Sequence, residues 1–219
     1  GSDYNLYDIV PEHSKKLKIE NPIISNEDLD KIKFIKNSNF KSSSISALYE
    51  LKKGHNGIEE ALQKMVNEVI SYVNKGSNII IISDRGVNEK MAAIPILLAC
   101  STIHHFLIKL KKRSKFGIVI ESSEPREPHH FSMLFGYGAS AINPYLVNEI
   151  IQHHHHQGFF KEQSLKLSIE KYNKAIANGI LKVMNKIGIS TLHSYRGAQI
   201  FEALGLRESF TKKYFSNTP

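Results

Sequence analysis

Four consecutive isoleucines at positions 79–82 constrain the fold of this chain more than any other feature. A strand without alternation between apolar and polar residues is buried on both faces, which is typical of a parallel strand covered by helices. The run stops at Ser83, Asp84 and Arg85, so a carboxylate and a guanidinium follow the carboxyl end of the strand. Ligands of α/β proteins gather at that edge. Asp84 and Arg85 are therefore either site residues or a helix cap with a local ion pair.

The rest of the chain repeats this alternation of helix and strand. Apolar spacing predicts helices over residues 26–34, 58–75, 92–111, 129–135, 145–152, 165–187 and 194–204, and strands over residues 79–82, 116–120, 139–142 and 188–190. Residues 210–215 are expected to form a terminal turn or helix. Short links between alternating elements give parallel strands with right-handed crossovers. The predicted fold is α/β, a partial or degenerate (β/α) barrel, with an open doubly wound sheet as the alternative.

Two segments fall outside this repeat. Residues 1–57 lack a clear period and are expected to form an irregular N-terminal arm, serine-rich at 42–46, that packs on a βα-repeat core of residues 58–219. Residues 153–160 contain four histidines and are expected to be a low-complexity insertion in a surface loop.

Composition restricts the class of protein. The net charge of +8 comes from scattered lysines without an RNA-reading motif or zinc-finger spacing, so we expect no nucleic-acid partner. No apolar run reaches bilayer length and no signal peptide is visible, so we expect a cytoplasmic or plastid protein rather than a secreted or membrane-bound one. Gly1-Ser2 has the form of a tag remnant. The single cysteine, Cys100, is expected to be a buried inert thiol.

Polar residues follow every predicted strand, and a charged segment follows the second one. In a barrel these groups would meet at one rim, where they could perform acid–base chemistry or bind an anion. The alternative is a set of ion pairs that brace the strand ends. The candidate rim comprises Asp84, Arg85, Glu121, Arg126, Glu127, His130, Asn143, Ser190 and Arg196.

The histidines and glycines give no cofactor signature. Adjacent histidines on a helix point in different directions, so no dedicated metal site is expected, although residues 153–156 could take up nickel or zinc incidentally. Gly136 and Gly138 lack the third glycine of a dinucleotide-binding turn.

Several long motifs resemble the large subunit of glutamate synthase. They include Ile-Ser-Asp-Arg-Gly at 82–86, Ala-Ile-Asn-Pro-Tyr-Leu at 141–146, Gly-Ile-Leu-Lys-Val-Met at 179–184 and Ser-Tyr-Arg-Gly-Ala-Gln-Ile-Phe-Glu-Ala at 194–203. The resemblance covers nearly the whole chain and points to the later portion of the family's central domain.

This resemblance implies a role rather than a catalytic site. The family makes two glutamates from glutamine and 2-oxoglutarate, with FMN and a 3Fe-4S cluster carrying electrons from NADPH, NADH or ferredoxin. It implies as partners an amidotransferase domain and an FMN-binding barrel of the same polypeptide, and a small electron-transfer subunit or domain. The nucleophilic cysteine, the flavin barrel and the cluster cysteines have no counterpart here, so we expect no catalytic, cofactor-binding or metal-binding residue in this chain.

The expected role is a connecting domain that links the glutaminase and FMN sites and supports internal ammonia transfer, inactive when isolated. The alternative is a free-standing (β/α) enzyme or anion-binding module with its site at the carboxyl rim of the strands.

Overall fold

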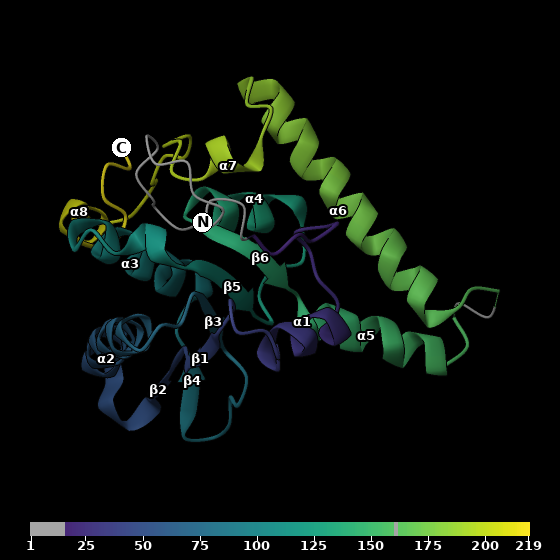
Figure 1. Cartoon of the computed structure of the whole chain (residues 1–219), viewed down its shortest axis with the longest axis horizontal. Helices are drawn as coiled ribbons and strands as arrows, with labels where there is room; N and C mark the ends of the chain where they lie inside the picture. Colours follow the sequence, from purple (N-terminus) through teal and green to yellow (C-terminus); the bar gives the residue numbers. More distant parts are fainter. Residues whose placement is uncertain (1–15, 160–161) are drawn as a thin grey trace.

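The computed structural model describes residues 16–159 and 162–219 of the chain. Its centre is a four-stranded parallel sheet in the order β1 (Ser42–Ser46), β3 (Ile79–Ser83), β5 (Gly117–Glu121) and β6 (Ala139–Asn143) (Figure 1). Each strand neighbours the next one along the chain, as in a (β/α) barrel, and the order has no reversal of the doubly wound kind. The described sheet is open, so the prediction of an α/β partial barrel is confirmed.

A short fifth segment extends the sheet beside β6. Ile23 forms a parallel bridge with Ile142, and the Ile24 amide donates to the Ile142 carbonyl at 2.9 Å. The chain therefore runs along one edge of the sheet before it supplies β1 at the other edge.

Helices cover the outer face of the sheet. Strand residues such as Ile80, Ile82 and Ile120 pack there into the larger apolar cluster. The covering helices are α2 (Gly54–Asn74), α3 (Ile96–Lys109) and α4 (Pro128–Gly136). Because successive strand side chains point to opposite faces, the isoleucine run supplies both faces at once.

Among the described residues, helix α1 (Asn26–Lys33) packs on the inner face. Leu29 and Ile32 of α1 pack in a second cluster against Ile79, Ile81 and Val119. In a closed barrel, side chains of the remaining strands would fill this space. Here α1 takes that place.

The N-terminal segment is more regular than the sequence predicted. Within residues 16–57 it contains α1, β1 and β2 (Leu48–Glu50), and η2 (Leu51–Lys53) leads directly into α2. The expectation of irregular structure at 42–46 is wrong, because β1 pairs with β3 over its full length. As an edge strand β1 buries only Ile45, so its sequence carries no apolar pattern.

The start of the second predicted helix is also different. β4 (Met91–Ala93) pairs antiparallel with β2, and α3 starts only after Pro95, its N-cap. A short turn, η3 (Arg113–Lys115), then leads to β5. Cys100 lies fully buried in α3, as predicted, and burial raises the pKa of its thiol to about 12.

Two long helices form an arm that projects from the sheet (Figure 1). α5 (Tyr145–His156) includes the four histidines, so the predicted loop insertion at 153–156 is wrong: these residues continue the helix by one turn. Phe159 is exposed, and the rest of the predicted insertion, residue 160, lies outside the described residues. α6 (Leu165–Ile187) contacts both α5 and α4.

The C-terminal region departs most from prediction. Residues 188–190 form no strand, because Gly188 closes α6 in a left-handed conformation and Thr191 already caps α7 (Leu192–Tyr195). The predicted helix over 194–204 is reduced to α7, because Gly197 and Gln199 have positive φ. The terminal helix is confirmed as α8 (Glu208–Tyr214). No helix of the described part is both long and apolar enough to cross a membrane.

Candidate functional site

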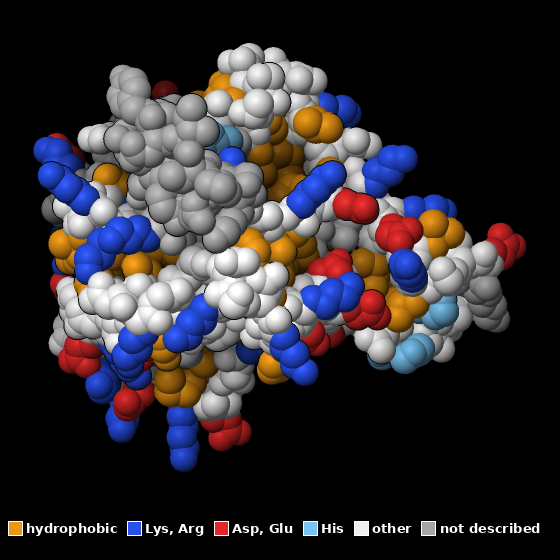
Figure 2. Space-filling view, viewed as in Figure 1, with side chains coloured by type: hydrophobic (Ala, Val, Ile, Leu, Met, Phe, Trp, Pro, Cys, Tyr) orange, Lys and Arg blue, Asp and Glu red, His pale blue; other side chains and the backbone are white. Residues whose placement is uncertain are grey.

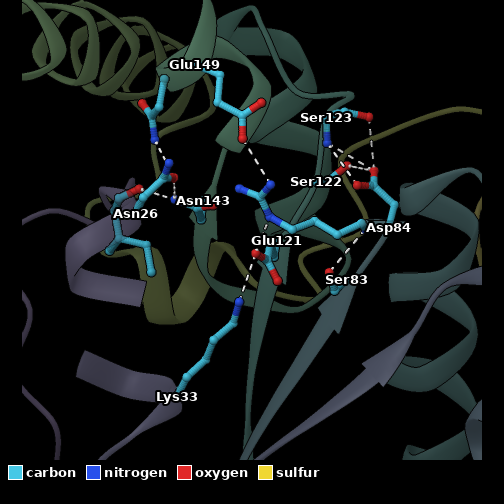
Figure 3. Close-up of polar contacts among 12 residues, drawn as sticks. Asn26, Lys33, Ser83, Asp84, Glu121, Ser122, Ser123, Asn143 and Glu149 are labelled. Carbon is cyan, nitrogen blue, oxygen red and sulfur yellow. Dashed lines mark hydrogen bonds and ion pairs between the residues drawn. The ribbon is translucent and has the colours of Figure 1, made fainter. Parts of the chain in front are cut away.

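Four predicted rim residues meet at the carboxyl edge of the sheet. Ser83, Glu121 and Asn143 are aligned by the strand register, and Asp84 and Arg85 follow directly after β3 (Figure 3). We call this group, with the side chains that contact it, the carboxyl-edge cluster. The parallel sheet thus brings together residues that lie up to 60 positions apart.

Glu121 is the centre of an ion-pair network. Only 3% of its side chain is exposed, and one carboxylate oxygen accepts from Lys33 Nζ at 2.9 Å and from Arg85 Nε at 2.7 Å. Burial alone would raise the pKa of Glu121, but hydrogen bonds from Lys33, Ser83 and Arg85 outweigh it and hold the pKa below its usual value. Glu121 is therefore a fixed anion that joins β5, β3 and α1.

Arg85 extends this network to the arm. Its Nη1 donates to Glu149 of α5 at 3.0 Å, and its guanidinium lies 3.8 Å from the centroid of the Tyr145 ring. Burial, with the adjacent Asp84 carboxylate, raises the pKa of Tyr145 to about 12, so this phenol stays protonated. Arg85 thus connects the end of β3 to the first two turns of α5.

Asp84 holds the loop that follows β5. It is fully buried and accepts from Ser122 Oγ at 2.6 Å and from the Ser123 amide at 3.0 Å. Glu124 in the same loop accepts from the Ile96 amide at the start of α3 at 3.1 Å. Burial raises the pKa of Glu124. Both carboxylates are occupied by groups of the protein itself, which is the expected pattern of a braced loop.

An asparagine network completes the cluster. Asn143 Nδ2 donates to the Ile24 carbonyl at 3.0 Å and to Asn26 Oδ1 at 2.9 Å, and Asn148 Nδ2 donates to the same oxygen at 3.1 Å. The Oδ1 atoms of Asn143 and Asn148 are buried and have no hydrogen-bond partner among the described residues. This network fixes α1 and α5 to the end of β6 (Figure 3).

Three further candidates form the start of α4 instead of a reactive group. The side chains of Glu127 and His130 form a capping box, each accepting from the other's backbone amide. His130 Nδ1 also accepts from the Arg126 amide at 3.2 Å, and the Arg126 carbonyl accepts from Tyr172 of α6 at 3.1 Å. These three residues therefore stabilise the start of α4 and its contact with α6.

The last two candidates lie elsewhere. Ser190 follows no strand, and Arg196 donates to Ser140 Oγ, near the amino end of β6, at 3.0 Å. The expectation that Ser190 and Arg196 share this rim is wrong, because it depended on a strand at 188–190 and a helix over 194–204 that the structure does not contain.

Sequence reasoning missed Asn26, Lys33, Asn148 and Glu149. These residues come from α1 and α5. The apolar pattern of a sequence predicts a helix but not the face of the sheet on which it packs, so their contacts could not be predicted. In the described residues no group of three or more metal-binding side chains is present. The cluster is a network of ion pairs and hydrogen bonds that holds α1, α5 and the loop after β5 on the sheet.

Comparison with known proteins decides the family. A profile described as "Glutamate synthase central domain" matches residues 1–207. The chain belongs to the glutamate synthase central domain family. It is 38% identical over its whole length to "Glutamate synthase [NADPH] large chain" of Bacillus subtilis strain 168, and covers 14% of that protein. It is 37% identical to "Glutamate synthase [NADH]" of Schizosaccharomyces pombe, covering 10%, and 33% identical to "Ferredoxin-dependent glutamate synthase 2" of a Synechocystis strain, covering 15%.

An iron–sulfur cluster does not fit the residues of this chain. Its single cysteine is buried and carries a raised pKa, so it cannot supply the several thiolates of an iron–sulfur cluster. Gly136 ends helix α4 and Gly138 directly precedes β6, whereas a phosphate-binding turn follows a strand and opens a helix.

Proposed function

We propose that this chain is the connecting central domain of a glutamate synthase that makes two glutamates from glutamine and 2-oxoglutarate. In this proposal it links the glutaminase and FMN sites and supports internal ammonia transfer, and it has no activity of its own. One observation carries the proposal: the whole chain matches a segment of proteins named glutamate synthase, and that segment is 10–15% of the length of each.

The carboxyl-edge cluster supports a structural role. Its two buried carboxylates, Asp84 and Glu121, accept hydrogen bonds from groups of the same chain, so neither is free to act as a nucleophile or general base. The contacts from Arg85 and Asn143 reach α5 and α1, which makes the cluster the point where the arm and the inner helix are held on the sheet. A domain that positions two neighbouring sites needs such rigidity.

The cofactors and partners belong to the rest of the polypeptide. In this proposal FMN, a 3Fe-4S cluster and an NADPH, NADH or ferredoxin donor act outside this chain. An amidotransferase domain and an FMN-binding barrel contact it, with a small electron-transfer subunit or domain as a further partner. The compartment is the cytoplasm or a plastid.

The connecting role is tested in the full-length polypeptide that contains this domain. Arg85→Ala removes the link between β3, β5 and α5. We expect glutamine-dependent glutamate synthesis to fall about 3- to 10-fold, because a misplaced domain loses ammonia between the two sites. Glutamate synthesis from added ammonium chloride should change less than about 2-fold, because this reaction does not need ammonia from the glutaminase site and Arg85 lies in a different domain from the FMN site. Lys182→Ala, an exposed change on α6, is the matched control.

The two assays separate the possible outcomes. Equal losses with glutamine and with ammonium, or no loss with either, would contradict the proposed role in ammonia transfer. The isolated 219-residue chain should neither hydrolyse glutamine nor show flavin absorbance. Sustained glutaminase turnover or stoichiometric FMN would refute the proposal.

A further inference from the structure

A pocket lies at the amino end of β6, far from the carboxyl-edge cluster in the fold. It has a volume of about 590 Å³ and is enclosed by α3, the end of α4, residues 197–201 and the C-terminal residues 212–218. α8 lies beside α3 and brings the C-terminal residues to this place (Figure 1). The volume falls within the range of about 300–1,000 Å³ that small-molecule sites have.

One wall presents a fixed hydrogen-bond donor. His104 Nδ1 accepts from Arg113 Nε at 3.0 Å, so the proton of the neutral imidazole is on Nε2. Burial, with the nearby Arg113 charge, lowers the pKa of His104 to about 3, so the ring stays neutral. Its Nε2 is on the Gly197 side, where a side chain on Gly197 would come within 3.9 Å of it.

Further polar atoms at the pocket have unused capacity. His105 Nε2 and Ser216 Oγ are buried and have no hydrogen-bond partner among the described residues. Buried polar atoms are rarely left without a partner, and these two belong to residues of the pocket wall, so we take them as candidate hydrogen-bonding groups for a ligand.

The charge at this pocket is of one sign. Lys109 and Lys212 line it, whereas no Asp or Glu of the described chain does. Lys212 is paired with Glu208, and Lys109 forms no ion pair within residues 16–159 and 162–219. Behind the wall lie Arg113 and Arg196, whose side chains bind imidazole, hydroxyl and carbonyl groups and, within the same residues, no carboxylate. Glu208 neutralises part of this charge through Lys212, but Lys109 and the two arginines leave an excess of cations that favours an anionic ligand.

Another part of the wall is apolar. Tyr137 and Phe201 stack with ring centroids 6.2 Å apart, and Ile200 lies beside them at the pocket. Aromatic and aliphatic walls with a few convergent polar groups are typical of sites for small organic molecules.

We propose that this pocket binds a small phosphorylated molecule with a planar or apolar body, of about the size of a mononucleotide. We take phosphate as the anionic group, because lysine ammonium groups are common point-charge ligands of phosphate and the cations that line the pocket are lysines. The several hydroxyl and imidazole donors match the three terminal oxygens of a phosphate monoester. This site is independent of the proposed connecting role.

The test is isothermal titration of the 219-residue chain with AMP, adenosine and inorganic phosphate. We expect saturable binding of AMP, at least about tenfold tighter than that of adenosine or phosphate alone, because only AMP engages both walls. The double variant Lys109→Gln/Lys212→Gln should weaken AMP binding about tenfold. The control Lys174→Gln/Lys182→Gln removes the same charge from exposed positions on α6 and should leave affinity unchanged within about twofold.

The comparison between variants decides the outcome. Absence of saturable AMP binding, adenosine binding as tight as AMP, or equal weakening in both double variants would each overturn the proposal. A further variant, Phe201→Ala, changes the apolar wall. Circular dichroism of the parent chain, the two double variants and Phe201→Ala identifies any variant that unfolds, and the test then uses the others. Phe201→Ala should weaken AMP and adenosine and leave phosphate unchanged.

Discussion

At the scale of single residues, Glu121 shows how the carboxyl edge contributes to stability. A carboxylate that is 3% exposed pays a desolvation cost, and two cations offset it from opposite sides. Lys33 and Arg85 are themselves partly exposed, so they can return to water if their partner is removed. The cost of removing Glu121 is therefore below that of a fully buried pair.

Glu121→Gln should lower the free energy of unfolding by about 1–3 kcal/mol, because the neutral amide keeps the volume but loses both charge-assisted hydrogen bonds. Urea unfolding followed by circular dichroism measures this change. Glu149→Gln is the matched control, since its pair with Arg85 is exposed and should contribute less than about 1 kcal/mol. Equal effects of the two substitutions would mean that burial of Glu121 does not matter.

The same residue predicts a pH dependence. The folded pKa of Glu121 lies below its ordinary value of 4.5, so the stability that it contributes is present above that value and is lost as pH falls through the folded pKa. The difference in unfolding free energy between the parent chain and Glu121→Gln should be constant above about pH 6 and shrink below about pH 4.5. A difference that grows on acidification would contradict the assigned ion pairs.

At the scale of elements, one glycine sets how the arm meets the core. A Cβ on Gly179 of α6 would lie 2.5 Å from Pro128 Cγ, at the first turn of α4. Glycine in a helix usually costs about 0.5–1 kcal/mol relative to alanine, so its presence here follows from the close approach of the two helices.

Gly179→Ala should therefore destabilise the chain by about 1–2 kcal/mol, because overpacking against Pro128 exceeds the gain in helix propensity. Asn178→Ala, at an exposed position one residue earlier, should be neutral or stabilising by up to about 0.5 kcal/mol. Thermal unfolding of both variants measures the contrast. A higher midpoint for Gly179→Ala would show that α6 and α4 do not pack closely.

Elements with a strong apolar pattern were predictable from the sequence, and elements placed by tertiary contacts were not. Strands β3, β5 and β6 and helices α2 and α6 follow their apolar runs. β1 could not be found, because an edge strand with one buried side chain reads as a serine-rich loop. The helix expected at 194–204 carries apolar residues at helical spacing, but positive φ at Gly197 and Gln199 prevents it. Asp84, Arg85, Glu121 and Asn143 could be placed together because parallel strand ends coincide, whereas their partners on α1 and α5 depend on long-range packing.

At the scale of the whole molecule, the N-terminal segment belongs to the core. Ile24, Leu29 and Ile32 close the inner face of the sheet, and the chain pairs with β6 at Ile23 and with β3 through β1. A flexible arm could be perturbed without effect on the sheet. A helix that packs on the inner face could not, because the buried isoleucines and valine of β3 and β5 would meet water.

Leu29→Ala should lower the free energy of unfolding by about 2–5 kcal/mol, since Leu29 is 2% exposed and packs against residues of the central strands. Hydrogen exchange read by mass spectrometry should show peptides from α1, β1, β3 and β5 losing protection together, because they share one core. Lys31→Ala, on the exposed side of the same helix, should leave stability almost unchanged. If α1 exchanged early while β3 and β5 stayed protected in the Leu29→Ala protein, the N-terminal segment would be an appendage and the sheet would be stable without it. Simultaneous loss would instead establish that the inner helix and the open sheet fold as one unit.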